Sequence, residues 1–402
     1  MNQRKKANQI LNQIIVNNKF ANLLMRNELQ GIEKDDASFI TNIVNGVLRN
    51  NRYLNYQYSN LLKSKCSKKD EILLNMAVYE LMFLNNEAYG VVNEYVSISK
   101  NKKFINGVLR NYLRKEQKEL TLDNLENIAI RYSINDWIIK LWNAHYGFDT
   151  TLKIAQSMNK IPKMTYRLNS LKCSYKDLDK YDIKIINDLA FESDTNLLKT
   201  DEFSEGKLLV QDYSSQCVVN YLDLVDNLSI LDICAAPGTK TTQIAQIINN
   251  TGRIIANDLY DNRVKLIDSL AKKLGITNIE TINEDATTVV FDETFDRILV
   301  DAPCSGLGVL RKKPDIKFRL TTNDLDEIIK IQELILNNVC KYLNKDGIMV
   351  YSTCTLNKKE NEKQVIKFLK SHEEYQLIEE KTIMPFENNS DGFYMAKLKR
   401  VK

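Results

Sequence analysis

Helical periodicity dominates residues 1 to about 115. Residues 39–48 and 104–113 each place apolar side chains on one face of a 3.6-residue repeat, which predicts amphipathic helices. Residues 72–84 are apolar on nearly every side, and a helix of that kind belongs in the centre of a bundle. The pattern therefore predicts an all-α N-terminal domain.

The next hundred residues carry a weaker and mixed pattern. Short helical stretches are expected at 137–142 and 152–158, and a strand is expected at 165–168. These elements predict a small α+β middle domain, to which the pattern alone assigns no chemistry.

From residue 230 onward, short apolar strands alternate with helical segments. Such alternation predicts right-handed βαβ crossovers and a parallel sheet with helices on both faces, which is a Rossmann-like α/β domain. The expected strands are 230–233, 254–257, 279–282, 297–300 and 348–351, and the expected helices are 241–248, 263–274 and 325–343. The chain is therefore predicted to consist of three domains, at 1–125, 126–220 and 221–402.

Composition narrows the class of protein. With 44% hydrophobic residues and only 13 Gly and 5 Pro among 402 residues, collagen-like and disordered chains are excluded. The chain has no apolar run near the roughly 18 residues that span a bilayer, and no apolar segment follows its basic N-terminus. We therefore expect a soluble cytoplasmic protein that is not associated with a membrane.

Charge is distributed unevenly along the chain. Residues 1–120 hold 19 Lys and Arg against 11 Asp and Glu, an excess of 8, whereas the remainder holds 37 against 41. A basic N-terminal module is typical of proteins that contact nucleic acid, because each neutralised phosphate releases counterions. A lysine-rich solvated surface explains the same excess about as well.

Acidic residues follow several of the predicted strands. Four acids stand at or beside the end of a predicted strand: Asp232, Asp258, Asp285 and Asp301. Asp258 lies 20 residues after Gly238 in the first strand-to-helix turn. A single acid in such a place is more often a turn former or a helix N-cap. Several in register at the carboxyl edge of one sheet indicate a ligand site. Because that first turn lacks the G-x-G-x-x-G glycines, a nucleoside cofactor without a pyrophosphate fits better than a dinucleotide.

Two of the seven cysteines also follow predicted strands at this edge. Cys304 and Cys354 lie in tight turns, where a thiol can be exposed and its pKa lowered from about 8.5 by basic neighbours or a helix N-terminus. Most free cysteines are small buried hydrophobic residues, which is the interpretation for Cys66, Cys173, Cys217 and Cys340. With two His in the chain and no C-x-x-C pair, neither a metal site nor a disulfide framework is expected.

Five sequence blocks resemble those of a known family. The blocks at 232–240, 301–308, 311–317, 351–355 and 391–396 are similar to the signatures of RNA cytosine-5 methyltransferases that use S-adenosylmethionine. Upstream, the stretches at 39–48, 77–84, 92–96 and 104–110 resemble the NusB-like helical domain of the branch that modifies bacterial 16S ribosomal RNA. The resemblance covers nearly the whole chain and implies a NusB-like domain, an RNA-binding middle domain and a class I methyltransferase domain.

The resemblance also implies a role for each candidate residue. Cys354 would attack carbon 6 of the target cytosine, Cys304 would assist release of the methylated base, and Asp301 would hydrogen-bond the ring nitrogen and contact the cofactor. Asp258 would hold the ribose and Asp285 the adenine of S-adenosylmethionine. The remaining implied cofactor residues are Cys234, Ala235, Ala236, Pro237, Gly238, Thr239, Lys240 and Arg263.

The expected partner is 16S ribosomal RNA, unassembled or partly assembled, and the enzyme is expected to act as a monomer without a metal. A methyltransferase that acts on transfer RNA or another RNA is the alternative within the enzyme class, because the catalytic domain is shared across substrates. A non-catalytic RNA-binding scaffold is a third possibility, which predicts that Cys354 and the cofactor carboxylates would be lost. Both are present.

Overall fold

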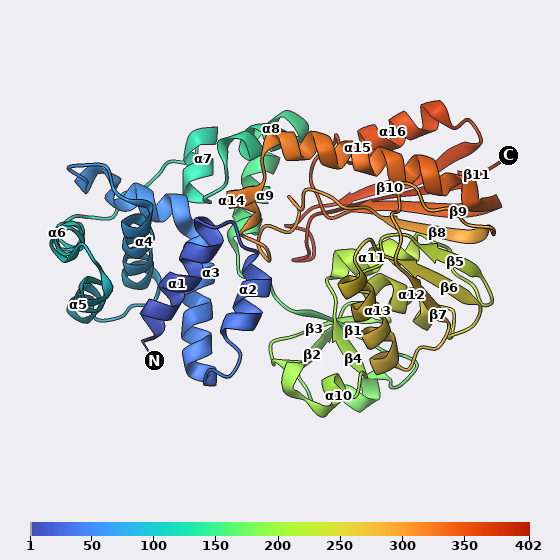
Figure 1. Cartoon of the computed structure of the whole chain (residues 1–402), viewed down its shortest axis with the longest axis horizontal. Coiled ribbons are helices and arrows are strands. Elements are labelled where there is room, and N and C mark those ends of the chain that lie inside the picture. The colour runs from blue at the N-terminus through green and yellow to red at the C-terminus, as the bar shows by residue number, and fades with distance from the viewer. Residues whose placement is uncertain (1) are drawn as a thin grey trace. The chain divides into compact units, whose positions relative to one another are not determined.

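The computed structural model describes residues 2–402 and divides into two compact units (Figure 1). One unit is helical and consists of the chain up to Ile161 together with Leu310–Leu320. The other consists of Pro162–Val309 and Thr321–Lys402 and contains both sheets. Residues 126–220 are thus divided between the two units, and the domain boundaries at 125 and 220 stay predictions.

The helical unit is built around α4 (Lys68–Phe83), whose residues are buried on nearly all sides as the sequence predicts. Its core includes one fully buried carboxylate, Glu80, which pairs with Arg4 and accepts hydrogen bonds from Tyr95 Oη at 2.9 Å and Asn86 Nδ2 at 2.9 Å. The surrounding helices are α1 (Gln3–Ile15), α2 (Ala21–Glu28), α3 (Lys34–Tyr58), α5 (Ala88–Ile98), α6 (Lys102–Leu113), α7 (Leu125–Arg131), α8 (Asp136–Tyr146) and α9 (Phe148–Asn159).

The segment Leu310–Leu320, which contains the short helix α14 (Ile316–Arg319), packs within this helical unit although it follows the catalytic-domain block at 301–308. Lys317 is buried there and donates from Nζ to the carbonyl oxygen of Arg49 at 3.0 Å, while Asn135 Nδ2 donates to the carbonyl of Lys317 at 2.9 Å. Burial lowers the pKa of the Lys317 ammonium to about 7.

The second unit contains a four-stranded antiparallel sheet in the order β2-β3-β1-β4, with a small core of its own around Tyr166 and Phe191. The strand predicted at 165–168 is β1, and the α+β character of this region is confirmed. The elements are β1 (Thr165–Leu168), β2 (Ile183–Ile185), β3 (Ala190–Ser193), α10 (Asp201–Ser204), β4 (Leu208–Val210) and α11 (Tyr213–Asn220).

The larger sheet has seven strands in the order β10-β11-β9-β8-β5-β6-β7. The five predicted strands are all present and pair in parallel, and two C-terminal strands add antiparallel pairs at one edge, so the sheet is mixed. The strands are β5 (Ser229–Asp232), β6 (Arg253–Asn257), β7 (Ile279–Ile282), β8 (Phe295–Asp301), β9 (Leu343–Thr353), β10 (Tyr375–Ile383) and β11 (Phe393–Arg400).

Helices cover both faces of this sheet (Figure 1). On one face pack α15 (Thr322–Val339) and α16 (Glu362–Ser371), and on the other pack α11, α12 (Thr239–Ile247) and α13 (Asp261–Leu274). The helix predicted at 325–343 ends at Val339, because β9 begins at Leu343. The Rossmann-like class predicted from the alternation of strands and helices is confirmed.

Polar side chains of β1 and the turn after it join the small sheet to the helices of the large one. Arg167 is fully buried and donates to the carbonyl of Thr239 at 2.5 Å, and Asn169 Nδ2 donates to the carbonyl of Leu274 at 3.0 Å. Lys172 Nζ donates to the carbonyl oxygen of Lys273, in the last turn of α13, at 2.7 Å, and a cation at this end also suits the helix dipole. The small sheet thereby supports the first turn of α12.

In residues 2–402, no helix is both long and apolar enough to cross a membrane.

Candidate active site

The turns that follow β5, β6, β7, β8 and β9 all lie at the carboxyl edge of the parallel strands. The registers Asp232 to Ala256, Asp232 to Leu299 and Asp301 to Ser352 bring the ends of β5, β6, β8 and β9 level with one another. The expected clustering of the candidate residues at one sheet edge follows from this parallel register.

The turn after β5 leads directly into α12. Gly238 has φ +96°, and a Cβ atom there would lie 3.1 Å from the Cα atom of Ile267 in α13. Only glycine combines that conformation with so close an approach of backbone to helix. The turn therefore delivers the backbone N–H groups of α12 close to the sheet edge, where they can face a ligand.

Arg263 joins the turn after β6 to the turn after β5. Its guanidinium lies 3.3 Å from Asp258 Oδ1 and donates to the carbonyl of Ala236 at 3.0 Å. Asp258 is 3% exposed, and its Oδ1 also accepts from the backbone N–H of Tyr260 at 3.2 Å. The carboxylate is thus held at a fixed place beside the turn.

Asn257 is a residue of this edge that the sequence analysis missed. Its Nδ2 donates to the carbonyls of Ile233 and Glu284, both at 3.0 Å, and its Oδ1 accepts from the backbone N–H of Glu284 at 2.9 Å. One fully buried amide therefore ties together the turns that follow three neighbouring strands. The sequence signal that could have identified Asn257 is its position directly before Asp258.

Asp285 is exposed and forms a local turn. Its Oδ1 accepts from the backbone N–H and the hydroxyl of Thr287 at 2.9 and 2.7 Å. This is the turn-forming role that a strand-end Asp commonly has. The contact to adenine that the resemblance implies stays a prediction.

Asp301, at the end of β8, accepts bonds at both carboxylate oxygens. Lys240 Nζ lies 2.6 Å from Oδ2, and Ser352 Oγ donates to Oδ1 at 2.8 Å. The ion pair joins the β5 turn to the β8 turn, and 27% of the Asp301 side chain is exposed, so a further ligand can reach it. A partly desolvated ion pair with two fixed donors is rigid enough to orient a substrate.

The two candidate thiols come together in the structure. Cys304 follows β8 and Cys354 follows β9, and their sulfur atoms lie 3.1 Å apart. Both side chains are half-buried rather than enclosed in the core. The sequence places them 50 residues apart, and the parallel pairing of β8 with β9 brings them into contact.

The expectation of a lowered thiol pKa is wrong for Cys304. The sulfur of Cys354, together with burial, raises the pKa of Cys304 well above its ordinary value. Glu360 contributes to this rise, and the ammonium group of Lys240 pairs with Asp301 rather than with a thiol. Cys304 is therefore held as a thiol that can share its proton with Cys354.

Asp232 is the strand-end acid to which the sequence assigned no separate role. Its Oδ2 accepts from Thr241 Oγ1 at 2.7 Å, whereas its buried Oδ1 has no hydrogen-bond partner within residues 2–402. Burial raises the pKa of the Asp232 carboxyl to about 7. An unpartnered buried oxygen beside the glycine turn indicates a place for a polar group of a ligand.

This edge has polar groups that suit a nucleoside. Asp258 offers a carboxylate suited to ribose hydroxyls, the turn around Gly238 is too tight for a side chain, and Asp232 supplies an acceptor that still needs a donor. Residues 2–402 contain no group of three or more His, Cys, Asp and Glu side chains placed to hold a metal.

Comparison with known proteins decides the family. The family model described as 16S rRNA methyltransferase RsmB/F matches residues 219–399, a NusB family model matches residues 1–114, and a ferredoxin-like domain model of RsmF/B-like methyltransferases matches residues 134–180. A probable ribosomal RNA small subunit methyltransferase B of Bacillus subtilis is 32% identical, over 96% of this chain and 95% of its own. The chain belongs to the RsmB/F family.

Other members and a solved structure agree with this assignment. A probable ribosomal RNA small subunit methyltransferase B of Synechocystis is 30% identical over 91% of both chains. The crystal structure of PH0851 matches 98% of this RsmB/F family member with a TM-score of 0.80 at 22% identity, which supports the fold. The family and the three-part fold predicted from the sequence are confirmed.

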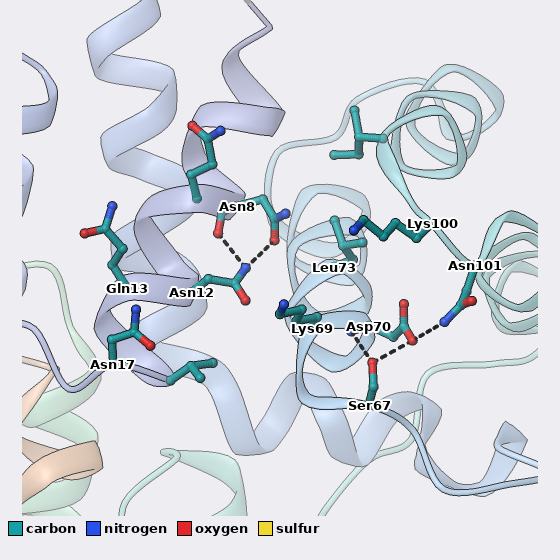
Figure 2. A pocket seen from close by; sticks show the side chains of 13 residues that line it. Asn8, Asn12, Gln13, Asn17, Ser67, Lys69, Asp70, Leu73, Lys100 and Asn101 are labelled. Carbon is teal, nitrogen blue, oxygen red and sulfur yellow. Dashed lines mark hydrogen bonds between the residues drawn. The ribbon is translucent and has the colours of Figure 1, made fainter.

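The NusB-like helices of this family member carry a second candidate site. Amide side chains and two lysines line a groove of about 720 Å³ between α1, the start of α4 and the α5–α6 turn (Figure 2). Asn12 donates to the carbonyl oxygen of Asn8 at 2.7 Å, while its own Oδ1 has no partner in the described part of the chain. The polar residues that line the groove are Asn8, Gln9, Asn12, Gln13, Asn17, Ser67, Lys69, Asp70, Lys100 and Asn101.

Proposed function

We propose that this protein transfers a methyl group from S-adenosylmethionine to carbon 5 of a cytosine in 16S ribosomal RNA through a covalent adduct with Cys354. The single observation that carries the proposal is the pair of thiols 3.1 Å apart beside Asp301, at the sheet edge that fits a nucleoside. Membership of the RsmB/F family supports the choice of RNA.

The cofactor is assigned to the edge formed by the turns after β5, β6 and β7. The turn at 234–240 would hold its methionine part, Asp258 the ribose hydroxyls and Asp285 the adenine amino group, with Arg263 keeping Asp258 in place. S-adenosylmethionine supplies an electrophilic methyl group when it is bound. Every other step belongs to the side chains of this chain.

Carbon 5 of cytosine is a weak nucleophile until a group adds to carbon 6. In the proposed reaction the thiolate of Cys354 forms a bond to carbon 6, and the ring electrons move toward carbon 5 and the ring nitrogen. Asp301, fixed by Lys240 and Ser352, must carry a proton at this stage, which it donates in a hydrogen bond to the ring nitrogen as negative charge develops there. The adduct therefore activates the carbon that receives the methyl group.

Release of the product needs a proton acceptor close to the adduct. Once carbon 5 is methylated, its proton must leave and the bond between carbon 6 and the Cys354 sulfur must break. Cys304 lies next to that sulfur. Its thiol has first to lose its own proton to water, and because its pKa is raised, the thiolate then formed is a strong base for the carbon 5 proton. Because the target base must reach a site at a sheet edge, it has to leave its stack, which favours an unpaired RNA region.

The cofactor assignment predicts selective stabilisation by a nucleoside without phosphates. S-adenosylhomocysteine should stabilise the protein against thermal unfolding, by about 2.7 kcal/mol at a hundredfold excess over its Kd, whereas NAD should not. Asp258→Ala should lose this stabilisation, and Asp261→Ala, which removes an exposed carboxylate from α13, should keep it. A melting temperature that rises with NAD and not with S-adenosylhomocysteine would contradict the assignment.

The groove in the NusB-like helices predicts a contact with the RNA. Amide groups can bond base edges and lysines can bond phosphates, and neither Lys69 nor Lys100 forms a salt bridge within residues 2–402. The double variant Lys69→Glu and Lys100→Glu should weaken RNA binding and lower the slope of log affinity against log salt by about 1 for each lost contact. The matched variant at Lys63 and Lys65, exposed lysines outside the groove, should bind nearly as the wild type does. Equal losses in the two double variants would instead indicate a general charge effect.

A further inference from the structure

A buried carboxylate lies between the loops that carry the two thiols. Glu360 is fully buried, and its Oε2 accepts from the backbone N–H of Ser305 at 2.8 Å and from Gln332 Nε2 at 3.2 Å. Its Oε1 accepts from Ser305 Oγ at 2.6 Å and from Asn357 Nδ2 at 2.9 Å. One side chain thus bonds the residue that follows Cys304 and a residue three positions after Cys354.

The two loops are also bonded to each other around this carboxylate. Ser305 Oγ and Thr355 Oγ1 lie 2.7 Å apart, and these are the residues that directly follow the two cysteines. Asn361, next to Glu360, accepts from Thr353 Oγ1 at 2.6 Å and donates to the carbonyl of Thr355 at 3.0 Å. The residues on both sides of Cys354 are therefore fixed from the same short segment.

Burial of the Glu360 carboxylate lowers the stability of the fold unless its hydrogen bonds offset the loss of water. A carboxylate buried away from water needs compensation, and here every partner is a neutral donor, because no lysine or arginine in residues 2–402 pairs with Glu360. An apolar side chain could fill the same space without that cost. Its four hydrogen bonds are directional and reach both loops, so they fix the position of one loop relative to the other, which apolar contacts would not do.

We propose that Glu360 is a positioning residue that sets the separation of the Cys304 and Cys354 sulfur atoms by bonding both of their loops. The proposal rests on the proposed function for its catalytic consequence. A displacement of a reacting group by about 1 Å can cost about 100-fold in rate. Loss of the carboxylate should therefore reduce kcat while binding of RNA and cofactor, which involves other residues, is retained.

Chemical cross-linking tests the separation of the thiols without relying on catalysis. Diamide, an azo oxidant, joins two neighbouring thiols: each thiol loses one proton and one electron, one S–S bond forms, and the N=N bond is reduced to a hydrazine. In the full-length wild type the Cys304–Cys354 link, mapped by peptide mass spectrometry, should form readily because the sulfur atoms lie 3.1 Å apart. In Glu360→Ala the link should form about tenfold more slowly.

Kinetics test the catalytic consequence. Glu360→Ala should lower kcat by about 100-fold with the KM for RNA changed by less than about twofold. Glu360→Gln should have a kcat between those of Glu360→Ala and the wild type. The Ser305 hydroxyl can turn to accept a hydrogen bond from the new amide. The bond to Asn357 should be lost, because the Asn357 oxygen already accepts from the backbone N–H of Lys359. This graded rescue is not expected of a residue that only supports the fold.

Glu202→Gln is the matched control. Glu202 is also a buried carboxylate of the same unit, but it bonds Lys180 and Tyr181 and touches neither thiol loop. Its replacement should lower the melting temperature and leave cross-linking and kcat near the wild-type values.

Two results would overturn the proposal: cross-linking in Glu360→Ala at the wild-type rate, or a kcat loss no larger than that of Glu202→Gln. If the wild type forms the cross-link but does not methylate 16S rRNA, the proposed function fails, and the comparison of cross-linking rates still decides the role of Glu360.

Discussion

Cys354→Ala will neither methylate RNA nor form a covalent complex with it. We expect no other side chain to replace it, since the sulfur next to it, that of Cys304, has a raised pKa. Incorporation of labelled methyl groups should fall to the background level. The S-adenosylhomocysteine-dependent rise in melting temperature should remain, because the sulfur of Cys354 is not assigned to the cofactor.

Cys304→Ala, unlike Cys354→Ala, should form the covalent complex with RNA. It keeps the nucleophile and loses the group that takes up the carbon 5 proton, so the adduct should form and resolve slowly. A denaturing gel after incubation with 16S rRNA and S-adenosylmethionine should show a protein–RNA band for this variant and none for Cys354→Ala. A band formed by Cys354→Ala alone would mean that the two roles are reversed.

Gly308→Ala will cause the second large loss. A Cβ atom at this position would lie 2.0 Å from the carbonyl oxygen of Gly392 and 2.8 Å from that of Cys354. The backbone N–H of Gly308 also donates to the Cys354 carbonyl at 3.0 Å, so any shift that relieves the contact moves the thiol loop. We expect a stability loss of about 2–3 kcal/mol and, in the folded fraction, a fall in kcat of about 100-fold.

Gly107→Ala provides the control for this variant. Gly107 lies within α6, and apart from the adjoining backbone of that helix nothing described would lie within 4 Å of its added Cβ. An alanine there should raise the free energy of unfolding by about 0.5–1 kcal/mol and leave turnover unchanged. Chemical denaturation and methyl incorporation measure both quantities. A Gly308→Ala protein with wild-type turnover would show that the close approach of the two loops is not needed.

The sequence predicts the sheet well because its signals are local. Each parallel strand is a short apolar run, and the edge at which a residue such as Asp258 or Cys354 stands follows from strand direction alone. The contact between Cys304 and Cys354 could be expected on the same ground, since neighbouring parallel strands end at the same edge. The resemblance to the family adds the roles.

Other features depend on contacts that no local pattern encodes. Asn257 and Glu360 act by bonding loops that are distant in sequence, and each looks like an ordinary polar residue beside a strand or helix end. The raised pKa of Cys304 arises from a partner 50 positions away. The pattern assigns Leu310–Leu320 to the catalytic domain, but the segment packs in the helical unit. Its packing depends on tertiary contacts such as that of the buried Lys317 with the carbonyl of Arg49, which no local pattern indicates.

The most direct test of the account is bisulfite sequencing of unmodified 16S rRNA after incubation with the purified protein and S-adenosylmethionine. A cytosine should become resistant to conversion with the wild type, and none should with Cys354→Ala or without the cofactor. Incorporation of labelled methyl groups without a resistant cytosine, or the same resistance produced by Cys354→Ala, would contradict it.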